Sequence, residues 1–227
     1  MKHKKDYKNI LIFSVVVFLF TIALTIWAWG KIPTDAQIPI HWNIKGEVDK
    51  YANKFFGLLN GPLSVFLLTL LLTFIPRIEP RIENLQQSQK AYQAVWGAIL
   101  VFIASLHIVT TLAALGYEEN ISMMMAFLLG TLFIAIGNYL GKIRSNFMFG
   151  IRTPWTLHSE VSWNKTHRLG GWLFMLIGLL VFLSGFLYNA ELTFGLLFGG
   201  LFLIVILLFA YSYWVWKGDE KKEVNKK

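Results

Sequence analysis

Cysteine is absent from this 227-residue chain. Its absence excludes disulfide bonds, thiolate chemistry and cysteine-ligated metals, so any chemistry must use histidine, carboxylates, arginine or hydroxyl groups. The sequence also lacks a metalloenzyme spacing such as HExxH and contains no convincing internal repeat. Neither a zinc protease of that type nor an inverted-repeat transporter therefore gains support.

Charged residues are missing from six long apolar stretches. A helix needs about 20 apolar residues to cross roughly 30 Å of hydrocarbon. The stretches that meet this length without Lys, Arg, Asp or Glu are residues 10–29, 56–75, 91–115, 121–140, 171–189 and 192–214. Hydrophobic residues make up 56% of the chain and its mean hydropathy is +0.54, values too high for a soluble globular domain. The sequence thus predicts an all-α, polytopic membrane protein with six transmembrane helices.

Basic residues are distributed unevenly between these stretches. The first stretch follows four lysines and resembles a signal peptide, but its apolar run is too long and lacks a small-residue cleavage site, so we expect a retained anchor. Placing both termini in the cytoplasm puts 17 of the 21 Lys and Arg residues on the inner side, as the positive-inside rule favours. The external loops are then weakly acidic.

These expectations divide the chain into six parts. They are a basic cytoplasmic N-terminus (1–9), the first two spans with an external loop at 30–55 (10–75), spans three and four (76–140), a cytoplasmic polar segment (141–170), spans five and six (171–214) and a basic cytoplasmic tail (215–227). We expect the tail to lie near anionic membrane lipids, whose headgroups attract clustered lysines.

The external loop contains the run PIHWNIKGEVD at 39–49. The dipeptide at 45–46 is typical of a turn, so residues 41–42 are predicted to pair with Val48 in a short hairpin on the outer face. The hairpin is a structural cap with its tryptophan in the interfacial aromatic belt, a docking surface for an extracellular molecule, or a sparse cation site without a recognised ligand spacing. The residues concerned are His41, Trp42, Asn43, Gly46, Glu47 and Asp49.

The most distinctive segment is GNYLGKIRSNFMFGIRTPWTLHSEVSWNKTHRLGG at 137–171, which is rich in Arg, Trp, His and Asn and separates two apolar stretches. Thr153 followed by Pro154 is typical of a helix start, so we predict a helix over 154–168 along the cytoplasmic interface and a turn at 170–171. The candidate binding residues of this segment are Asn138, Arg144, Asn146, Arg152, Trp155, Trp163, His167 and Arg168.

Several roles are compatible with this segment. Guanidinium groups form forked hydrogen bonds to phosphate or carboxylate, so the arginines are candidates for an anion site. Attraction to anionic lipid explains the same charges. Asn138 lies at membrane depth, where an amide is expected to find a partner inside the bundle. His158, Glu160 and His167 are candidates for a metal or an acid–base pair, although they lack an established spacing.

Both polar segments resemble one known family. The external IPIHWNIKGEVDKYANK is similar to a small domain of unknown function, DUF1648, with its pattern of Pro, His-Trp-Asn and Gly-Glu-Val-Asp. The inner GKIRSNFMFGIRTPWTLHSEVSWNKTHRLGG resembles the signature of the SdpI immunity-protein family of Bacillus-like bacteria. Together they cover about a quarter of the chain, and their order and the number of spans also fit.

The resemblance implies a multi-pass protein of the bacterial cell membrane that is not an enzyme, needs no cofactor and binds no nucleic acid directly. It implies protection against a secreted, SdpC-like peptide toxin. It also implies signalling, in which the membrane protein sequesters a small cytoplasmic winged-helix repressor (SdpR-like). The toxin is expected outside or within the bilayer, and the repressor at the inner segment.

Motif residues are carried over by the resemblance without individual roles. Outside they are His41, Trp42, Gly46 and Asp49, and inside they are Asn138, Gly141, Arg144, Asn146, Gly150, Arg152, Thr153, Pro154, Trp155, Trp163, His167 and Arg168. Two other functions stay open. A transporter or small-molecule binding protein needs a polar path, with His107, Asn138 and the inner arginines as candidates. A membrane enzyme acting on lipid or peptide would use His158, Glu160 and His167.

Overall fold

The computed structural model describes residues 7–117 and 121–224, and within those ranges six helices are long and apolar enough to cross a membrane. The elements in chain order are α1 (Lys8–Trp29), β1 (Gln37–Trp42), β2 (Val48–Asn53), α2 (Lys54–Ile78), α3 (Ile82–Gln87), α4 (Gln89–Ala114), α5 (Ile121–Leu140), α6 (Pro154–His158), α7 (Glu160–Ser184), the 3-10 turn η1 (Gly185–Leu187) and α8 (Ala190–Val224). The predicted helical, six-span architecture is confirmed. Residues 1–6 of the predicted N-terminal part and 225–227 of the tail lie outside the described ranges.

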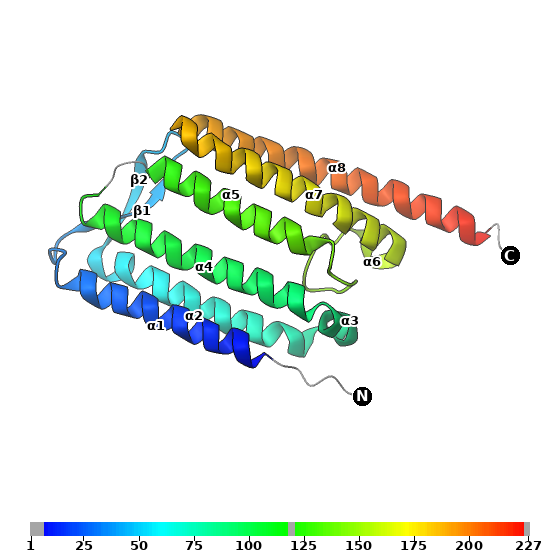
Figure 1. Ribbon diagram of the computed structural model, residues 1–227, viewed down its shortest axis with the longest axis horizontal. Helices are drawn as coiled ribbons and strands as arrows, with labels where there is room; N and C mark the ends of the chain where they lie inside the picture. The colour runs from blue at the N-terminus through cyan, green and yellow to red at the C-terminus, as the bar shows by residue number, and fades with distance from the viewer. Residues whose placement is uncertain (1–6, 118–120, 225–227) are drawn as a thin grey trace.

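The long helices lie side by side in two groups (Figure 1). In one group α1, α2 and α4 contact one another, and in the other α7 packs against both α5 and α8. The groups meet where α4 packs on α5. The β1–β2 hairpin lies at one end of the bundle, which we call the hairpin end, and α3, α6 and the loop 141–153 lie at the other, which we call the signature end.

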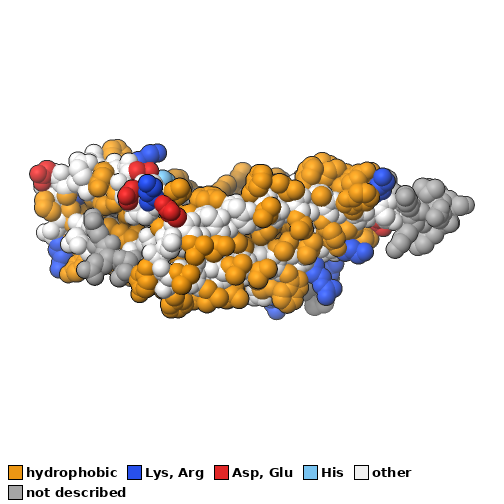
Figure 2. All heavy atoms as spheres, turned by 90° about the horizontal axis from the view of Figure 1, so that it is seen from above, with side chains coloured by type: hydrophobic (Ala, Val, Ile, Leu, Met, Phe, Trp, Pro, Cys, Tyr) orange, Lys and Arg blue, Asp and Glu red, His pale blue; other side chains and the backbone are white. Residues whose placement is uncertain are grey.

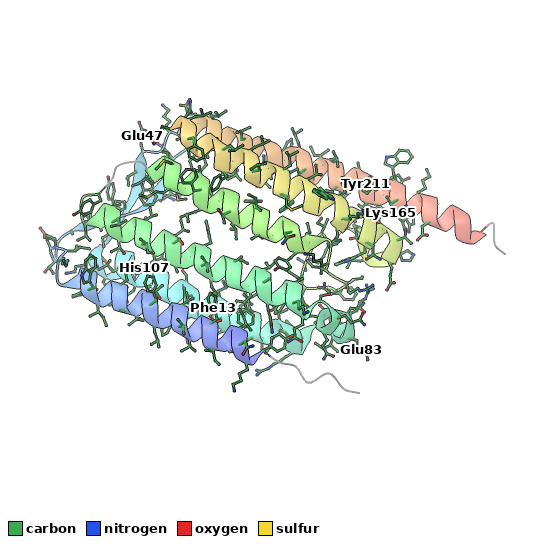
Figure 3. The ribbon with its side chains drawn as sticks, viewed as in Figure 1. Phe13, Glu47, Glu83, His107, Lys165 and Tyr211 are labelled. Carbon is green, nitrogen blue, oxygen red and sulfur yellow. The ribbon has the colours of Figure 1, made fainter. Side chains whose placement is uncertain are left out.

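Hydrophobic side chains cover the outside of the bundle along its length (Figure 2). Leu70 in α2 and Leu203 in α8, for example, are 52% and 66% exposed. Charged side chains gather toward the ends, where Glu47 marks the hairpin end and Glu83 the signature end (Figure 3). Soluble proteins rarely expose continuous apolar surface of this extent, whereas lipid acyl chains cover it without cost. The molecule is a multi-pass membrane protein.

Four glycines let α5 and α7 approach at backbone distance. A Cβ on Gly137 would lie 2.6 Å from the carbonyl oxygen of Gly171, and a Cβ on Gly130 would lie 2.6 Å from that of Gly178. The reverse substitutions meet the same obstacle at 2.8 and 2.7 Å. Small residues along a seam allow such close packing in lipid, where van der Waals contact drives helix association. The seam holds the first half of α7, with its signature residues, against α5.

The helix predicted over 154–168 is interrupted. Its start is confirmed, because Thr153 is the N-cap of α6 and Pro154 stands at the first helical position. The helix nevertheless ends at His158. Ser159 adopts an extended backbone (φ −125°, ψ 124°), which no helix continues.

The turn predicted at 170–171 is absent. Ser159 caps α7 by accepting a hydrogen bond from the amide of Ser162, so the helix begins at Glu160 and continues through both glycines to Ser184. The second half of the predicted interfacial helix is therefore the first part of the fifth long helix. Gly171 serves the seam with α5 rather than a turn.

Candidate functional site

The hairpin over residues 37–53 is confirmed in its register, with Trp42 opposite Val48. The Asn43 side-chain oxygen accepts hydrogen bonds from the backbone amides two and four residues later, at 2.8 and 3.1 Å. Gly46 completes the turn with a φ of +81°, a conformation that glycine adopts without strain. Asn43 and Gly46, both predicted as binding residues, therefore shape the hairpin.

His41 and Asp49 face each other across the two strands. Their Nδ1 and Oδ1 atoms lie 2.5 Å apart, and the side chains are 57% and 39% exposed. An exposed pair of this kind adds at most about 1 kcal/mol to stability, so fold stability alone is a weak reason for it. Among the described residues no three His, Asp or Glu side chains gather to hold a metal ion. The pair offers a polar contact on the exposed face of the hairpin.

Lys54 ties the hairpin to the bundle, although it was not predicted as a site residue. Its buried ammonium group donates hydrogen bonds to the carbonyl oxygens of Trp29 and Ile32, both at 2.6 Å. Carbonyls at a helix C-terminus lack partners within the helix, and a cation there also balances the helix dipole. Lys54 thus joins the end of α1 to the start of α2.

At the signature end, Glu79 organises the loop 141–153. This carboxylate is 5% exposed and follows the last turn of α2. Its oxygens accept hydrogen bonds from the backbone amides of Phe147 at 3.0 Å, Met148 at 3.0 Å and Arg81 at 2.8 Å. Charge-assisted bonds of this type are stronger than neutral ones, so Glu79 fixes the path of the loop from the opposite side of the chain.

Arg81 holds the same loop through its side chain. The guanidinium group donates to the hydroxyl of Ser145 and, at 3.1 Å, to the carbonyl of Leu157. It also lies 4.6 Å from the centre of the Phe147 ring, within the range of a cation–π contact. Arg81 is therefore committed to internal contacts and is poorly placed to bind a separate anion.

Asn146 is fully buried within the loop. Its side-chain oxygen accepts from the amides of Met148 and Phe149 at 3.0 and 2.7 Å, and its amide group donates to the carbonyl of Arg144 at 2.9 Å. The Arg144 amide in turn donates to the Ser88 hydroxyl at 2.8 Å. Asn146, predicted as a binding residue, supports the backbone that presents Arg144.

Trp163 and His167 stack on each other in the interior, with ring centres 3.9 Å apart. The indole nitrogen of Trp163 donates to the Ile143 carbonyl at 2.7 Å. His167 donates from Nδ1 to the Trp163 carbonyl and accepts at Nε2 from the Ile151 amide, both at 2.9 Å. A carbonyl only accepts and an amide N–H only donates, so this geometry requires a neutral ring with its proton on Nδ1. Both nitrogens are occupied, and the pair locks the loop onto α7.

Trp155 and the start of α7 dock on α8. The Trp155 ring packs edge-on against Phe209 and Tyr213, with ring centres 4.7 and 5.2 Å apart. The Ser162 hydroxyl donates to the Ser212 carbonyl at 2.8 Å. These contacts place Trp155 in a helix interface rather than on the free surface.

The three predicted arginines differ from these buried residues. Arg144, Arg152 and Arg168 all have exposed side chains. Arg152 donates to the Phe147 carbonyl at 2.5 Å, which orients it without burying it. We call these three side chains the exposed arginines, since they are charged groups of the segment that a partner can reach.

Asn138 does not meet the expectation of a partner inside the bundle. Its side chain is exposed, and its oxygen lies 3.5 Å from the ammonium group of Lys142. It stands two residues before the end of α5, so the helix end and the following lysine supply its surroundings. His107, the other residue considered for a polar path, is buried in α4 toward the hairpin end (Figure 3). The two therefore do not line one path.

Comparison with known proteins supports the two motif assignments. Residues 142–212 match the SdpI/YfhL protein family, and residues 16–73 match a domain of unknown function, DUF1648. The first match covers the loop 141–153, α6, α7 and most of α8, while the second covers the hairpin with most of α1 and α2.

One curated relative matches over most of its length. It is Immunity protein SdpI of Bacillus subtilis (strain 168), 25% identical over 206 residues, which are 89% of this chain and 90% of the relative. No solved structure matches the chain. The predicted resemblance is thus confirmed, and the chain is related to the SdpI family through its signature end, with a DUF1648 region carrying the hairpin.

Proposed function

We propose that this chain is a membrane immunity protein that protects its host from a secreted, SdpC-like peptide toxin. The observation that carries the proposal is the similarity to Immunity protein SdpI, which extends through both groups of helices and both polar ends. A membrane protein without an assembled metal centre among its described residues suits a binding role of this kind.

The hairpin end faces outward in this proposal. With that orientation the Lys- and Arg-rich signature end and both termini lie in the cytoplasm, as the positive-inside rule favours. A secreted peptide then reaches the exposed face of the hairpin, where His41 and Asp49 provide polar contacts. It also reaches the outer half of the bundle through the lipid.

The exposed arginines are the proposed docking surface for a cytoplasmic winged-helix repressor. Glu79, Arg81 and Asn146 hold the backbone beneath them, so the surface is preorganised and loses little freedom on binding. Signalling requires that toxin bind two states of the bundle with different affinity. The glycine seam between α5 and α7 is a rigid link that connects the hairpin end to the signature end.

Survival of a toxin-sensitive bacterium tests the immunity proposal. Cells expressing this chain alone are challenged with an SdpC-type peptide, and the amount of protein in the membrane is measured in parallel. Colony formation above that of cells with an empty vector supports immunity without a partner. Killing at full membrane expression would reject protection against this class of toxin.

A catalytic or transport role has weaker support. His167 has both ring nitrogens bonded to the backbone, and His158 packs its ring near that of Trp216 at 6.3 Å between centres. A catalytic base needs a free nitrogen within reach of its substrate. His107 and Asn138 lie at different depths, as described above, so a transport path through both gains no support.

A further inference from the structure

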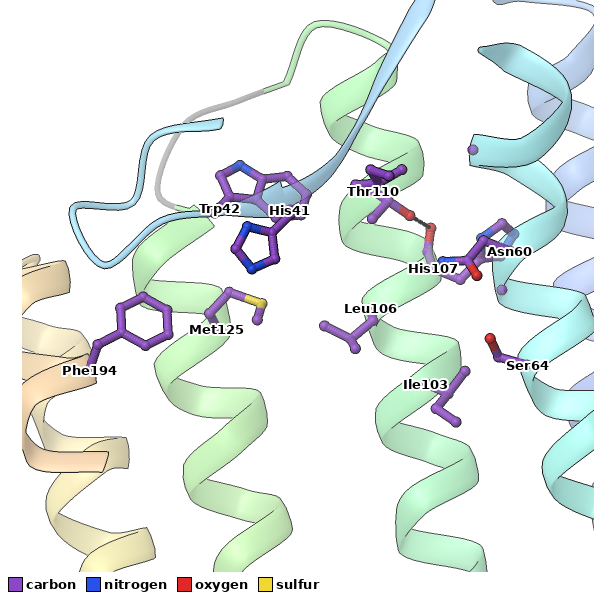
Figure 4. Close-up of a pocket in the computed structure, with 13 residues that line it drawn as sticks. His41, Trp42, Asn60, Ser64, Ile103, Leu106, His107, Thr110, Met125 and Phe194 are labelled. Atoms are coloured by element: carbon purple, nitrogen blue, oxygen red, sulfur yellow. Dashed lines mark hydrogen bonds between the residues drawn. The ribbon is translucent and has the colours of Figure 1, made fainter. Parts of the chain in front are cut away.

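A cavity of about 320 Å³ lies beneath the hairpin, between the two groups of helices. Strand β1 forms its roof, α2 and α4 form one side, and α5 and α8 contribute Met125 and Phe194 opposite (Figure 4). Its volume falls at the lower end of the range of about 300–1,000 Å³ that is usual for ligand pockets. The walls are mainly apolar, and the side chains responsible are Ile40, Trp42, Ile103, Leu106, Met125 and Phe194.

A polar strip runs down the α2 side of this cavity. Asn60 and Ser64 are four residues apart and therefore lie on one helix face. Asn60 stands six residues after Lys54, which places it about 9 Å along the helix from the start of α2. Within the described ranges neither side chain has a hydrogen-bond partner. A partnerless amide inside an apolar span is costly, so it marks a place where a polar group of a ligand is accepted.

His107 adds an unpartnered acceptor to the same cavity. Its side chain lines the cavity near Asn60 and is 2% exposed (Figure 4). Thr25 donates its hydroxyl proton to the Leu58 carbonyl at 3.1 Å and lies 3.0 Å from His107 Nε2. The Thr25 oxygen must therefore accept from Nε2–H, which leaves Nδ1 as an acceptor, and Nδ1 has no partner among the described residues.

Gly61 is what allows this histidine to sit against α2. A Cβ at position 61 would lie 2.4 Å from His107 Cγ and 2.5 Å from Nδ1. The glycine, the buried ring and its threonine partner thus form a built site, in which the imidazole is held from one side and left unsatisfied on the other. A histidine with only a packing role would gain from a partner at both nitrogens.

We propose that this cavity receives a segment of the toxin peptide, with apolar side chains against Trp42 and Leu106 and hydrogen-bonding groups against Asn60, Ser64 and His107. The inference rests on the proposed immunity function and names the site that carries it. A lipid acyl chain would fill the apolar part but brings no donor for His107. A peptide brings backbone N–H and C=O groups, which suit an asparagine side chain that both donates and accepts.

Binding of a fluorescent SdpC-type peptide to the full chain in lipid nanodiscs tests the site. Leu106→Trp fills the cavity, while Val101→Trp on the same helix adds the same bulk on a half-exposed, lipid-facing position and serves as its matched control. Asn60→Leu removes the polar group at nearly constant size. We expect binding and survival to be lost with Leu106→Trp, retained with Val101→Trp and weakened about tenfold with Asn60→Leu, the effect of one lost hydrogen bond.

The possible outcomes separate the site from the function. Helical content by circular dichroism and a monodisperse elution profile establish that each variant folds. If the unchanged chain binds peptide and protects, and folded Leu106→Trp and Asn60→Leu do both equally well, the cavity is not the toxin site and immunity stands. If Leu106→Trp releases a co-purifying lipid without affecting peptide binding, the occupant is an acyl chain and the proposal is overturned. If the unchanged chain neither binds nor protects, immunity and the toxin site fall together.

Discussion

Replacing Glu79 is the perturbation that tests the signature end most sharply. Its carboxylate accepts bonds from the backbone amides of Arg81, Phe147 and Met148. In Glu79→Ala these amides lose their acceptor, and each buried unsatisfied group costs about 1–3 kcal/mol. Phe147 is exposed, so water reaches part of the loop and the low end of that range applies. We expect the free energy of unfolding to fall by about 3 kcal/mol, the low-end cost of three amides.

The measurement is denaturant unfolding in detergent micelles, combined with hydrogen exchange at the amides of Phe147 and Met148. Exchange at these two positions should rise more than in the helices. Glu83→Ala is the matched control, because Glu83 is an exposed carboxylate on the neighbouring α3 and its loss should change stability by less than about 0.5 kcal/mol. Unchanged protection of both amides in Glu79→Ala would refute the assignment of Glu79 as the organiser of the loop.

Three further predictions follow from the packing and the charges. Gly137→Leu should force α5 away from Gly171 and lower the thermal midpoint, whereas Gly195→Leu on α8, which has open space within 4 Å, should not. Lys54→Met should lower unfolding free energy by about 2 kcal/mol, because two carbonyls lose a charged partner; an unchanged denaturation curve would contradict this. Arg152→Ala should abolish repressor capture in a pull-down while leaving stability nearly intact, and capture at the level of the unchanged chain would remove Arg152 from the docking surface.

The spans were predictable because hydrocarbon thickness sets helix length. Predicted and observed ends agree within a few residues for most spans, and the fifth is the exception. It begins at Glu160 rather than at 171, because charged and polar residues 160–168 continue the same helix. The hairpin was predictable as well, since Asn43 and Gly46 carry local turn chemistry.

The interior of the signature end was not predictable from local sequence. Glu79 and Ser88 hold the loop across 68 and 56 residues of chain, and composition does not reveal such pairings. Sequence also shows which residue types are present but not which way they face. Trp163, His167 and Asn146 were predicted as binding residues, yet the structure places them inside, where they support the exposed arginines.

Lys54 and Asn60 carried weak signals that a closer reading can use. A single lysine directly before an apolar span suggests a cap for the preceding helix, and an asparagine within a span suggests a polar contact at membrane depth. Neither signal names its partner. The partner of Lys54 became visible only when the fold placed the end of α1 beside the start of α2.

The central claim, immunity, is tested most directly by the peptide concentration that halves the growth of a toxin-sensitive bacterium. Cells that express the full chain are compared with cells that express a version truncated by an early stop codon, at matched growth rate and with membrane levels of the full chain verified. The account predicts that the inhibitory concentration of an SdpC-type peptide rises at least about tenfold, equivalent to 1.4 kcal/mol of protection. Equal inhibitory concentrations in the two strains would contradict it.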